Sequence, residues 1–480
     1  MFESVKDLSA AVAAAATIEG DRITVKNTSA LAHEVIDRLA WTAAFGASPE
    51  IKGTARWVIR SLAAAAGIRP ASIHDLYIAM GQGKTGGFTV PAINVRAMAY
   101  DTARAVIRAA KKLNAGAFIF EIARSEIGYT EQRPHEYASI LFAAALREGF
   151  NGPLFIQGDH VQTNAKKYNS PERDKELETL RGLIREEIAA GFYNIDIDTS
   201  TLVDLDKPTL AEQQEVNVTL AADFAAFIRS VEPSGVTVSI GGEIGEVGGK
   251  NSDIHELHCY MEGLNAKLKE RGAHVGISKI SVQTGTAHGG FINADGTVRK
   301  DVAIDLVALE ELSTAARKYG MGGAVQHGAS TLPLEAFDAF PRVGACEIHL
   351  ATDFQNMVYD HPQFPADLKA EMYAWLREHA QEERKPKDTE EQFIYKARKK
   401  AIGPFKRQMW GMDAAQRDAI GASLEERFSR LMSLLKINGT ADAVKQFVTV
   451  PHVPLTLDAE VKAAAGIITA AERKAEGLAD

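Results

Sequence analysis

Eight short apolar runs, separated by stretches of helical length, constrain the fold of this chain more than any other feature. Between the runs, apolar residues recur at helical spacing, as in Ala103, Val106, Ile107 and Ala110. This repeated alternation predicts a (β/α)8 TIM barrel, an α/β fold whose parallel strands close into a ring. The candidate strands are residues 88–94, 117–122, 154–157, 193–198, 236–243, 280–284, 323–327 and 346–351.

A doubly wound open sheet is the alternative fold for such a pattern. Polar residues end nearly every apolar run, among them Asn94, Asp159, Glu243 and His327. In a barrel the carboxyl ends of all strands meet at one face, where catalytic groups collect. The distribution of polar residues therefore favours the barrel.

The eight runs define three regions in the 480-residue chain. Residues 79–360 form the predicted TIM-barrel catalytic domain. Residues 1–78 and 361–480 carry helical patterns and are interpreted as N-terminal and C-terminal helical extensions. We expect these extensions to pack on the barrel or on another subunit.

Composition excludes several classes of protein. The chain is 46% hydrophobic and 24% charged, with a net charge of −9, so a large core is available and no basic nucleic-acid surface is indicated. The densest basic stretch, residues 396–407, is interpreted as a solvated helix face, with an anion site as the alternative.

The cysteine content and the absence of a long apolar segment predict a cytoplasmic protein. The two cysteines, Cys259 and Cys346, exclude a disulfide scaffold and favour a reducing compartment. Cys346 lies in an apolar run and is expected to be a small core residue. No apolar stretch reaches the roughly 20 residues that a membrane span needs.

Three histidines end candidate strands and suggest a metal site. His160 follows Asp159 directly, while His288 and His327 are each followed by glycine. Catalytic zinc commonly takes three protein ligands and keeps one position open. Three unrelated polar residues at the barrel mouth are the alternative.

Glycine and hydroxyl residues after the later strands suggest an anion site. Gly289 and Gly290 follow the sixth run, and Gly328 and Ser330 follow the seventh. Barrels often bind phosphate with the loops after their last two strands. Thr352, at the end of the eighth run, would join them.

Taken in order, several segments resemble the class II, metal-dependent fructose-bisphosphate and tagatose-bisphosphate aldolases. The resemblance covers about residues 80–355. Single motifs are weak, but the ordered set is specific. The segments are Gly87-Phe88-Thr89-Val90-Pro91-Ala92-Ile93-Asn94, Gly158-Asp159-His160, the segment 191–200, Gly242-Glu243-Ile244-Gly245, Gly285-Thr286-Ala287-His288-Gly289 and His327-Gly328-Ala329-Ser330.

The resemblance implies a Zn²⁺ ion, with another divalent metal as the alternative, and also allows a monovalent cation. Asp159 would move a proton at the aldol carbon or hydroxyl, and the metal would stabilise an enediolate after C3–C4 cleavage of a ketose. The implied metal ligands are His160, His288 and His327, with Glu243 as an alternative position. The implied substrate-binding and phosphate-binding residues are Asn94, Gly289, Gly328, Ser330, His349, Thr352 and Asp353.

The last strand departs from the family pattern. His349 replaces a substrate-contacting asparagine, and Ala351 replaces an aspartate. Three interpretations stay open: an aldolase for a different sugar phosphate, a ketose 4-epimerase that works by retro-aldol chemistry, and a non-catalytic accessory subunit. Lys279 begins its strand rather than ending it, which argues against a Schiff-base lysine. The family further suggests a homo-oligomer that binds a sugar or sugar phosphate.

Overall fold

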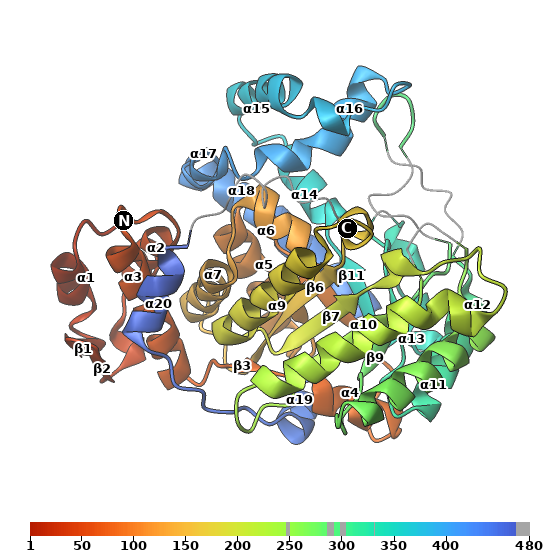
Figure 1. The fold of residues 1–480 in the computed structure, drawn as a ribbon. Coiled ribbons are helices and arrows are strands. Elements are labelled where there is room, and N and C mark those ends of the chain that lie inside the picture. Colours follow the sequence, from red (N-terminus) through yellow and green to blue (C-terminus); the bar gives the residue numbers. More distant parts are fainter. Residues whose placement is uncertain (246–249, 286–291, 298–303, 331, 467–480) are drawn as a thin grey trace.

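Eight parallel strands close into a barrel in the computed structural model, which describes residues 1–245, 250–285, 292–297, 304–330 and 332–466 (Figure 1). Each strand pairs with the next, and the last pairs with the first, which confirms the TIM barrel and all eight predicted runs. The short strand β3 (Pro70–Ala71) adds to the start of β6. The barrel strands are β4 (Val90–Asn94), β5 (Ile119–Ala123), β6 (Leu154–Gln162), β7 (Asn194–Asp198), β8 (Ser239–Glu243), β9 (Lys279–Val282), β10 (Ala324–Gln326) and β11 (Glu347–Leu350).

Helices cover the outside of the barrel, and their ends follow from local sequence. Thr209 and Glu212 form a capping box that begins α10, and Asp253 with Glu256 does the same for α11. Gly191 ends α9 in the left-handed conformation. The helices are α4 (His74–Gly81), α5 (Ala99–Lys112), α6 (Arg124–Thr130), α7 (Pro134–Arg147), α8 (Ala165–Tyr168), α9 (Arg173–Ala190), α10 (Leu210–Val231), α11 (Ile254–Glu270), α12 (Leu306–Lys318), α13 (Ala339–Arg342) and α14 (Thr352–Tyr359).

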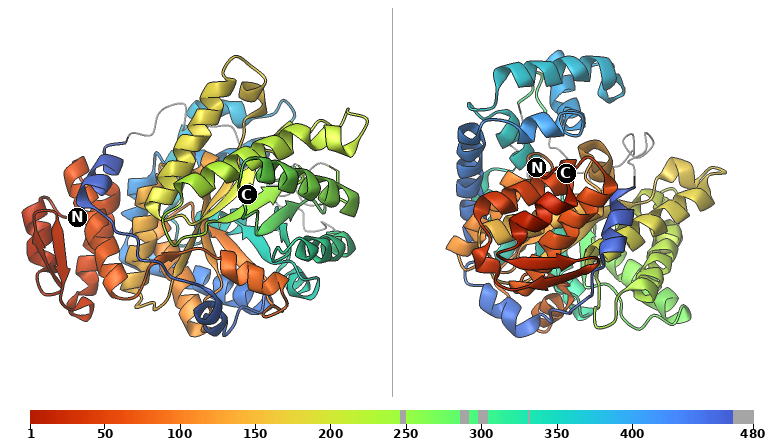
Figure 2. Two further views of the ribbon diagram at one scale, coloured as in Figure 1. Left: turned by 60° about the horizontal axis from the view of Figure 1, so that its bottom comes forward. Right: turned by 90° about the vertical axis from the view of Figure 1, so that its left-hand side faces the viewer.

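The N-terminal extension is not helical throughout. Helices α1 (Val5–Val12), α2 (His33–Phe45) and α3 (Pro49–Ala65) are accompanied by an antiparallel hairpin of β1 (Ala16–Glu19) and β2 (Arg22–Val25) (Figure 2). The hairpin alternates only weakly between buried and exposed positions, so its pattern did not stand out beside the alanine-rich helix before it.

The C-terminal extension returns along the barrel and reaches the N-terminal extension. Helix α18 packs against α5, and α20 packs against α3. The Arg60 guanidinium joins the last pair by an ion pair of 2.8 Å with the buried Glu460. The elements are α15 (Ala366–His379), α16 (Glu390–Ala397), the 3-10 turn η5 (Arg398–Ala401), α17 (Lys406–Trp410), α18 (Ala414–Leu434), α19 (Ala441–Phe447) and α20 (Leu457–Ala464).

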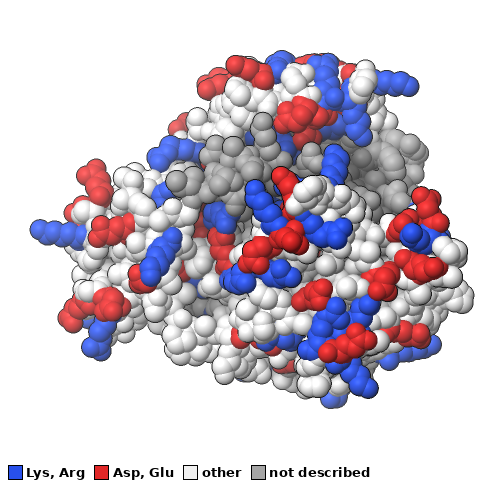
Figure 3. All heavy atoms as spheres, viewed as in Figure 1, with Lys and Arg blue, Asp and Glu red and all other residues white. Residues whose placement is uncertain are grey.

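The surface and core agree with the composition. Acidic and basic side chains are mixed over the face shown in Figure 3, and no single-sign field covers it. Cys346 is fully buried, as its apolar surroundings predicted. Within the described part of the chain, no helix combines the length and apolar character needed to cross a membrane.

Candidate functional site

A bulge in β6 sets the direction of Asp159 and His160. The pairing of β6 with β7 shifts register between Gly158 and Val161, and His160 has a φ of +39°. Bulges next to active sites commonly redirect a side chain, and a non-glycine residue at positive φ is strained. Gly158 is required here, because an added Cβ would lie 2.5 Å from the buried Glu187 carboxylate on α9.

His160, Glu243 and His327 form a compact group at the carboxyl ends of the strands, here called the mouth cluster. Each offers one ligand atom, and these atoms lie within 4.8 Å of one another. His160 Nδ1 lies 3.4 Å from Glu243 Oε2, and the two imidazole rings are 4.4 Å apart. All three residues are buried, so the group is shielded from bulk water.

Two neighbouring side chains orient these imidazoles. Asp198 Oδ2 lies 3.2 Å from His160 Nδ1, and Ser281 Oγ lies 3.0 Å from His327 Nε2. His327 Nδ1 is 3.9 Å from Glu243 Oε1. Hydrogen bonds of this kind fix the tautomer of a metal-binding histidine.

Together with its neighbours Asp159 and Asp198, the mouth cluster contains three carboxyl groups and two imidazoles. Burial, strengthened by the charge of Asp198, raises the pKa of Glu243 to about 8. Burial opposes protonation of His160, but the charge of Asp159 and hydrogen bonds with Asp198 and Glu243 outweigh it and raise the pKa of this imidazole. Crowded carboxyl groups favour any added positive charge. The donor set therefore fits a divalent cation, because imidazole nitrogen and carboxylate oxygen are ordinary metal ligands.

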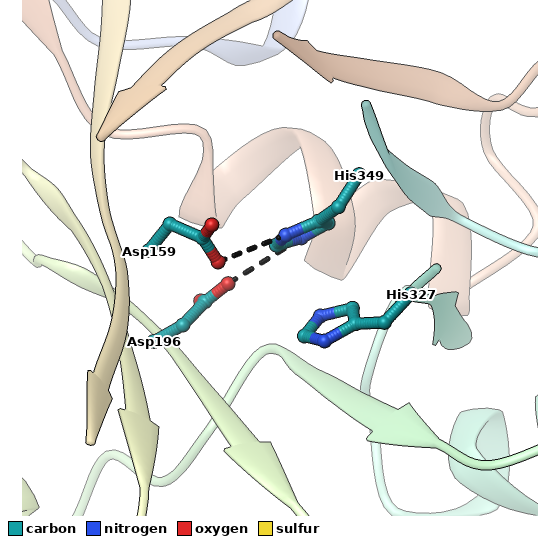
Figure 4. Close-up of side chains that lie close together, drawn as sticks. All are labelled: Asp159, Asp196, His327 and His349. Atoms are coloured by element: carbon teal, nitrogen blue, oxygen red, sulfur yellow. Dashed lines mark hydrogen bonds and ion pairs between the residues drawn. The ribbon is translucent and has the colours of Figure 1, made fainter. Parts of the chain in front are cut away.

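Asp159 lies beside the mouth cluster and is held from two sides. Its Oδ1 is 3.6 Å from His160 Nε2, and its Oδ2 accepts a hydrogen bond of 3.3 Å from Asn94 Nδ2. His349 Nδ1 is 3.0 Å from Oδ1 (Figure 4). The rings of His349 and His327 lie 4.1 Å apart, so His349 connects the acid to the cluster.

A second set of buried charges, here called the base layer, lies further inside the barrel. Lys279 begins β9, as predicted, and its ammonium group pairs with the Glu347 carboxylate and lies 2.9 Å from Asp196. Gln157 Oε1 accepts a third hydrogen bond of 2.7 Å. His349 Nε2 contacts Glu347 Oε1 at 2.6 Å and Asp196 Oδ2 at 3.5 Å, and thereby joins the two layers.

Arg96 and Glu126 extend the site towards β11. Glu126 accepts hydrogen bonds from Asn94 Nδ2 and the Ala123 N–H, each 2.8 Å long, and pairs with Arg96. Arg96 Nη1 lies 3.4 Å from Thr352 Oγ1. One polar chain thus runs from Asp159 through Asn94, Glu126 and Arg96 to a residue predicted to bind phosphate.

The remaining predicted residues have different surroundings. Ser330 Oγ accepts the Ala351 N–H at 2.8 Å, and Asp353 pairs with Arg427 of α18 at 3.2 Å. Ser330 and Asp353 line a small, mostly apolar cavity of about 10 Å³. Gly328, at a φ of +66°, follows His327. His288 and Gly289 lie outside the described residues.

Sequence reasoning missed several members of the site. Asp198 falls within the segment 191–200 but has no role in the sequence analysis, and Ser281 and Glu126 are not singled out there. The available signal was a charged residue such as Glu126 in the first turn of the helix that follows an apolar strand. The partners of Ser281 and Arg96 lie on elements distant in sequence, and no local pattern indicates them.

A family model described as class-II fructose-bisphosphate aldolase matches residues 76–410. Solved structures of related fold include a probable tagatose 6 phosphate kinase from Sinorhizobium meliloti 1021, which is 18% identical and has a TM-score of 0.51 over 75% of this chain and 98% of that chain.

Two further structures align less closely. A fructose-bisphosphate aldolase from Campylobacter jejuni is 18% identical with a TM-score of 0.46, over 77% of this chain and 97% of that chain. A fructuronate-tagaturonate epimerase, UxaE, from Cohnella laeviribosi is 13% identical with a TM-score of 0.47, over 90% of this chain and 89% of that chain.

Proposed function

Because this chain belongs to the class II fructose-bisphosphate aldolase family, we propose that it is a metal-dependent enzyme that cleaves or forms the C3–C4 bond of a ketose phosphate. The observation that carries this proposal is the position of Asp159, a buried carboxylate 3.6 Å from an imidazole of the mouth cluster. An acid–base group beside a set of metal ligands suits carbon–carbon bond cleavage next to a carbonyl.

His160 and His327 would hold the metal, with Glu243 as a third donor, and zinc is the metal we expect from the ligand types. A bound divalent ion supplies Lewis-acid stabilisation of the negative charge that develops on ketose oxygens. Asp159 takes the proton from the C4 hydroxyl during cleavage and returns it during bond formation.

Asn94 and His349 keep Asp159 in position for this transfer. Both contact its carboxylate, and both are buried, so their side chains are held in place by packing. Lys279 is committed to Glu347 and Asp196 in the base layer, which supports a mechanism without a lysine Schiff base.

A ketose 4-epimerase is the second candidate, and two observations favour it. His349 stands where the resemblance places an asparagine, and it brings a second proton-exchanging group to Asp159. The C-terminal extension also packs η5 against α6, the helix that directly follows β5. An epimerase must retain both fragments after retro-aldol cleavage, and an extension packed on the helix beside the mouth would help it to do so.

Product analysis separates these candidates. Purified, zinc-loaded protein would be incubated with fructose 1,6-bisphosphate, tagatose 1,6-bisphosphate and the two free ketoses, and products would be resolved by carbon NMR. Triose phosphates support the aldolase, and interconversion of fructose and tagatose forms without trioses supports the epimerase. The absence of both turnover and bound metal would contradict both candidates and support an accessory subunit. The Asp159→Asn variant serves as the control, because loss of turnover in it would show that the activity comes from this site.

A further inference from the structure

A cavity of about 420 Å³ lies at the amino-terminal end of the barrel, opposite the mouth cluster. Two of its lining residues fix this position, because Pro70 pairs with the first residue of β6 and Tyr193 directly precedes β7. The segment 451–455, part of the connection between α19 and α20, forms another wall (Figure 1). The volume is within the range of small-molecule sites, roughly 300–1,000 Å³.

Three parts of the chain supply apolar walls to this cavity. Ile23 and Val25 line it from the hairpin strand β2, and Phe142 lines it from α7. Val453 and Leu455 line it from the connection before α20. Both are half-buried, whereas the residues on either side of each are exposed, so alternate side chains of this segment turn inward. Walls of this kind favour the hydrocarbon part of a ligand.

The charged side chains of the cavity are all basic. Arg60, Arg69 and His452 line it, and no aspartate or glutamate is found among its described lining residues. The Arg60 guanidinium is already balanced by its ion pair with Glu460. The excess positive charge of the cavity therefore comes mainly from Arg69.

Arg69 has no partner for its guanidinium. The group makes no hydrogen bond or ion pair within the described part of the chain, and its Nε is buried without an acceptor. The backbone at Arg69 is fixed, because its carbonyl accepts the Leu154 N–H at 2.9 Å. A buried donor without an acceptor destabilises the free protein, and an oxyanion bound beside it would remove that cost.

We propose that this cavity binds a small amphipathic anion, with a carboxylate or phosphate head on Arg69 and a hydrocarbon body against the apolar walls. The planar donors of arginine match both oxyanions. The cavity is separate from the mouth cluster, so its ligand is a different molecule from the ketose. The inference therefore does not rest on the proposed function.

A ligand in this cavity would connect three parts of the molecule. Strand β2 and helix α3 belong to the N-terminal extension, Tyr193 belongs to the barrel, and the segment 451–455 belongs to the C-terminal extension. A molecule that binds all three parts binds the folded chain and not the unfolded one. Occupation of the cavity should therefore raise the melting temperature.

Calorimetric titration of the full chain with octanoate and with octyl phosphate tests this site, at concentrations where both probes are monomeric. We expect at least one of them to bind at a single site per chain and to raise the melting temperature. Acetate lacks the hydrocarbon body and 1-octanol lacks the charge, so each should bind at least tenfold more weakly.

Substitutions at the cavity provide the second part of the test. Arg69→Met keeps most of the side-chain stem but removes the guanidinium, so it should weaken binding at least tenfold, and Arg69→Lys should recover part of the affinity. Val453→Glu keeps the arginine and supplies a carboxylate from the wall, and it should also prevent binding. Lys175→Met is the matched control, because it removes one exposed positive charge from α9, whose other end lines the cavity.

The relative affinities of the two probes identify the head group. Tighter binding of octyl phosphate supports a phosphate ester, and tighter binding of octanoate supports a carboxylic acid. The proposal is overturned if neither anion binds, if 1-octanol binds as tightly as the anions, or if Arg69→Met binds them as tightly as wild type does.

Discussion

The base layer and the mouth cluster are both buried inside the same barrel, yet their carboxyl groups behave in opposite ways. Burial disfavours ionisation of Glu347, but Lys279 and His349 outweigh it and hold the pKa of this carboxyl well below its usual range. Burial raises the pKa of Glu243 to about 8, and neighbouring Asp198 adds to the effect. The base layer contains its own cation, the Lys279 ammonium group. The mouth cluster and the neighbouring Asp159 and Asp198 have only imidazoles to balance their carboxyl groups.

This difference indicates separate roles for the two layers. A buried ion pair that is fully hydrogen-bonded stabilises or specifies a fold, but it is poorly suited to chemistry because its charges are committed. Carboxyl groups crowded in and around the mouth cluster are costly to the metal-free protein and favour a bound cation. His349 contacts Glu347 in the base layer and Asp159 at the mouth, so the base layer helps to fix the position of Asp159.

The largest effect is expected from Asp159→Asn. This change keeps the shape of the side chain but removes the group that moves the proton, so turnover should fall by roughly 10²- to 10⁴-fold. The melting temperature should stay constant or rise, because one charge leaves a crowded acidic region. Steady-state assays and thermal melts measure the two effects, with Asp37→Asn as the control at a residue of the N-terminal extension that pairs with Arg147. Unchanged turnover in Asp159→Asn would remove Asp159 from the mechanism.

Unlike Asp159→Asn, the Lys279→Met variant should have a lower free energy of unfolding than wild type. It removes the ammonium group that pairs with Glu347 and Asp196 in the barrel interior, and breaking a buried pair on one side costs about 3–5 kcal/mol. Urea unfolding of the metal-free protein measures the loss, and the exposed Lys250→Met provides the control. Addition of Glu347→Gln should recover part of the stability. A loss similar to that of the control would mean that the base layer is not structural.

The predicted parts of this molecule depend on local sequence patterns. The eight strands, the burial of Cys346 and the strand-starting position of Lys279 all followed from apolar runs and their polar ends. The closeness of His160 to His327 followed from barrel geometry, because parallel strand ends meet at one face.

The remaining features depend on register and on contacts distant in sequence. No pattern in residues 158–161 indicates the bulge that turns His160 to positive φ. The position of Lys399 beside Tyr129 is a contact across 270 residues of sequence, and periodicity contains no information about such a contact. The basic stretch that includes Lys399 was interpreted as a solvated face, but Arg398 is in fact buried.

Ser281→Ala should weaken metal binding at the mouth cluster and leave the base layer unchanged. The serine hydroxyl contacts His327 Nε2 at 3.0 Å, and loss of such an orienting group typically weakens metal affinity by about 10- to 100-fold. Competition with a zinc chelator measures the affinity. Ser278→Ala is a matched control, since this buried serine bonds to Ser239 at 2.7 Å, at the other end of the barrel. Equal zinc affinity in both variants would show that the contact between Ser281 and His327 does not support metal binding.

Stability should also depend on pH, with opposite signs in the two layers. In the metal-free protein, Glu243 titrates at about 8, whereas an unfolded glutamate titrates near 4.3. Between these values the folded state holds a proton that the unfolded chain has lost, so Glu243 lowers stability as pH rises, by at most about 1.4 kcal/mol per pH unit. Glu243→Gln removes this slope, and the variant should gain stability relative to wild type from pH 5 to pH 8.

Glu347→Gln provides the comparison in the base layer. Because the pKa of folded Glu347 is depressed, its stabilising contribution is present above the unfolded pKa and is lost as pH falls through the folded value. This variant should therefore be less stable than wild type at pH 7, and the difference should shrink below about pH 4, where the unfolded glutamate becomes protonated. Urea unfolding at a series of pH values measures both variants. Parallel pH trends in the two variants would show that the two layers share one electrostatic environment and would contradict the division between a compensated base layer and an acidic mouth.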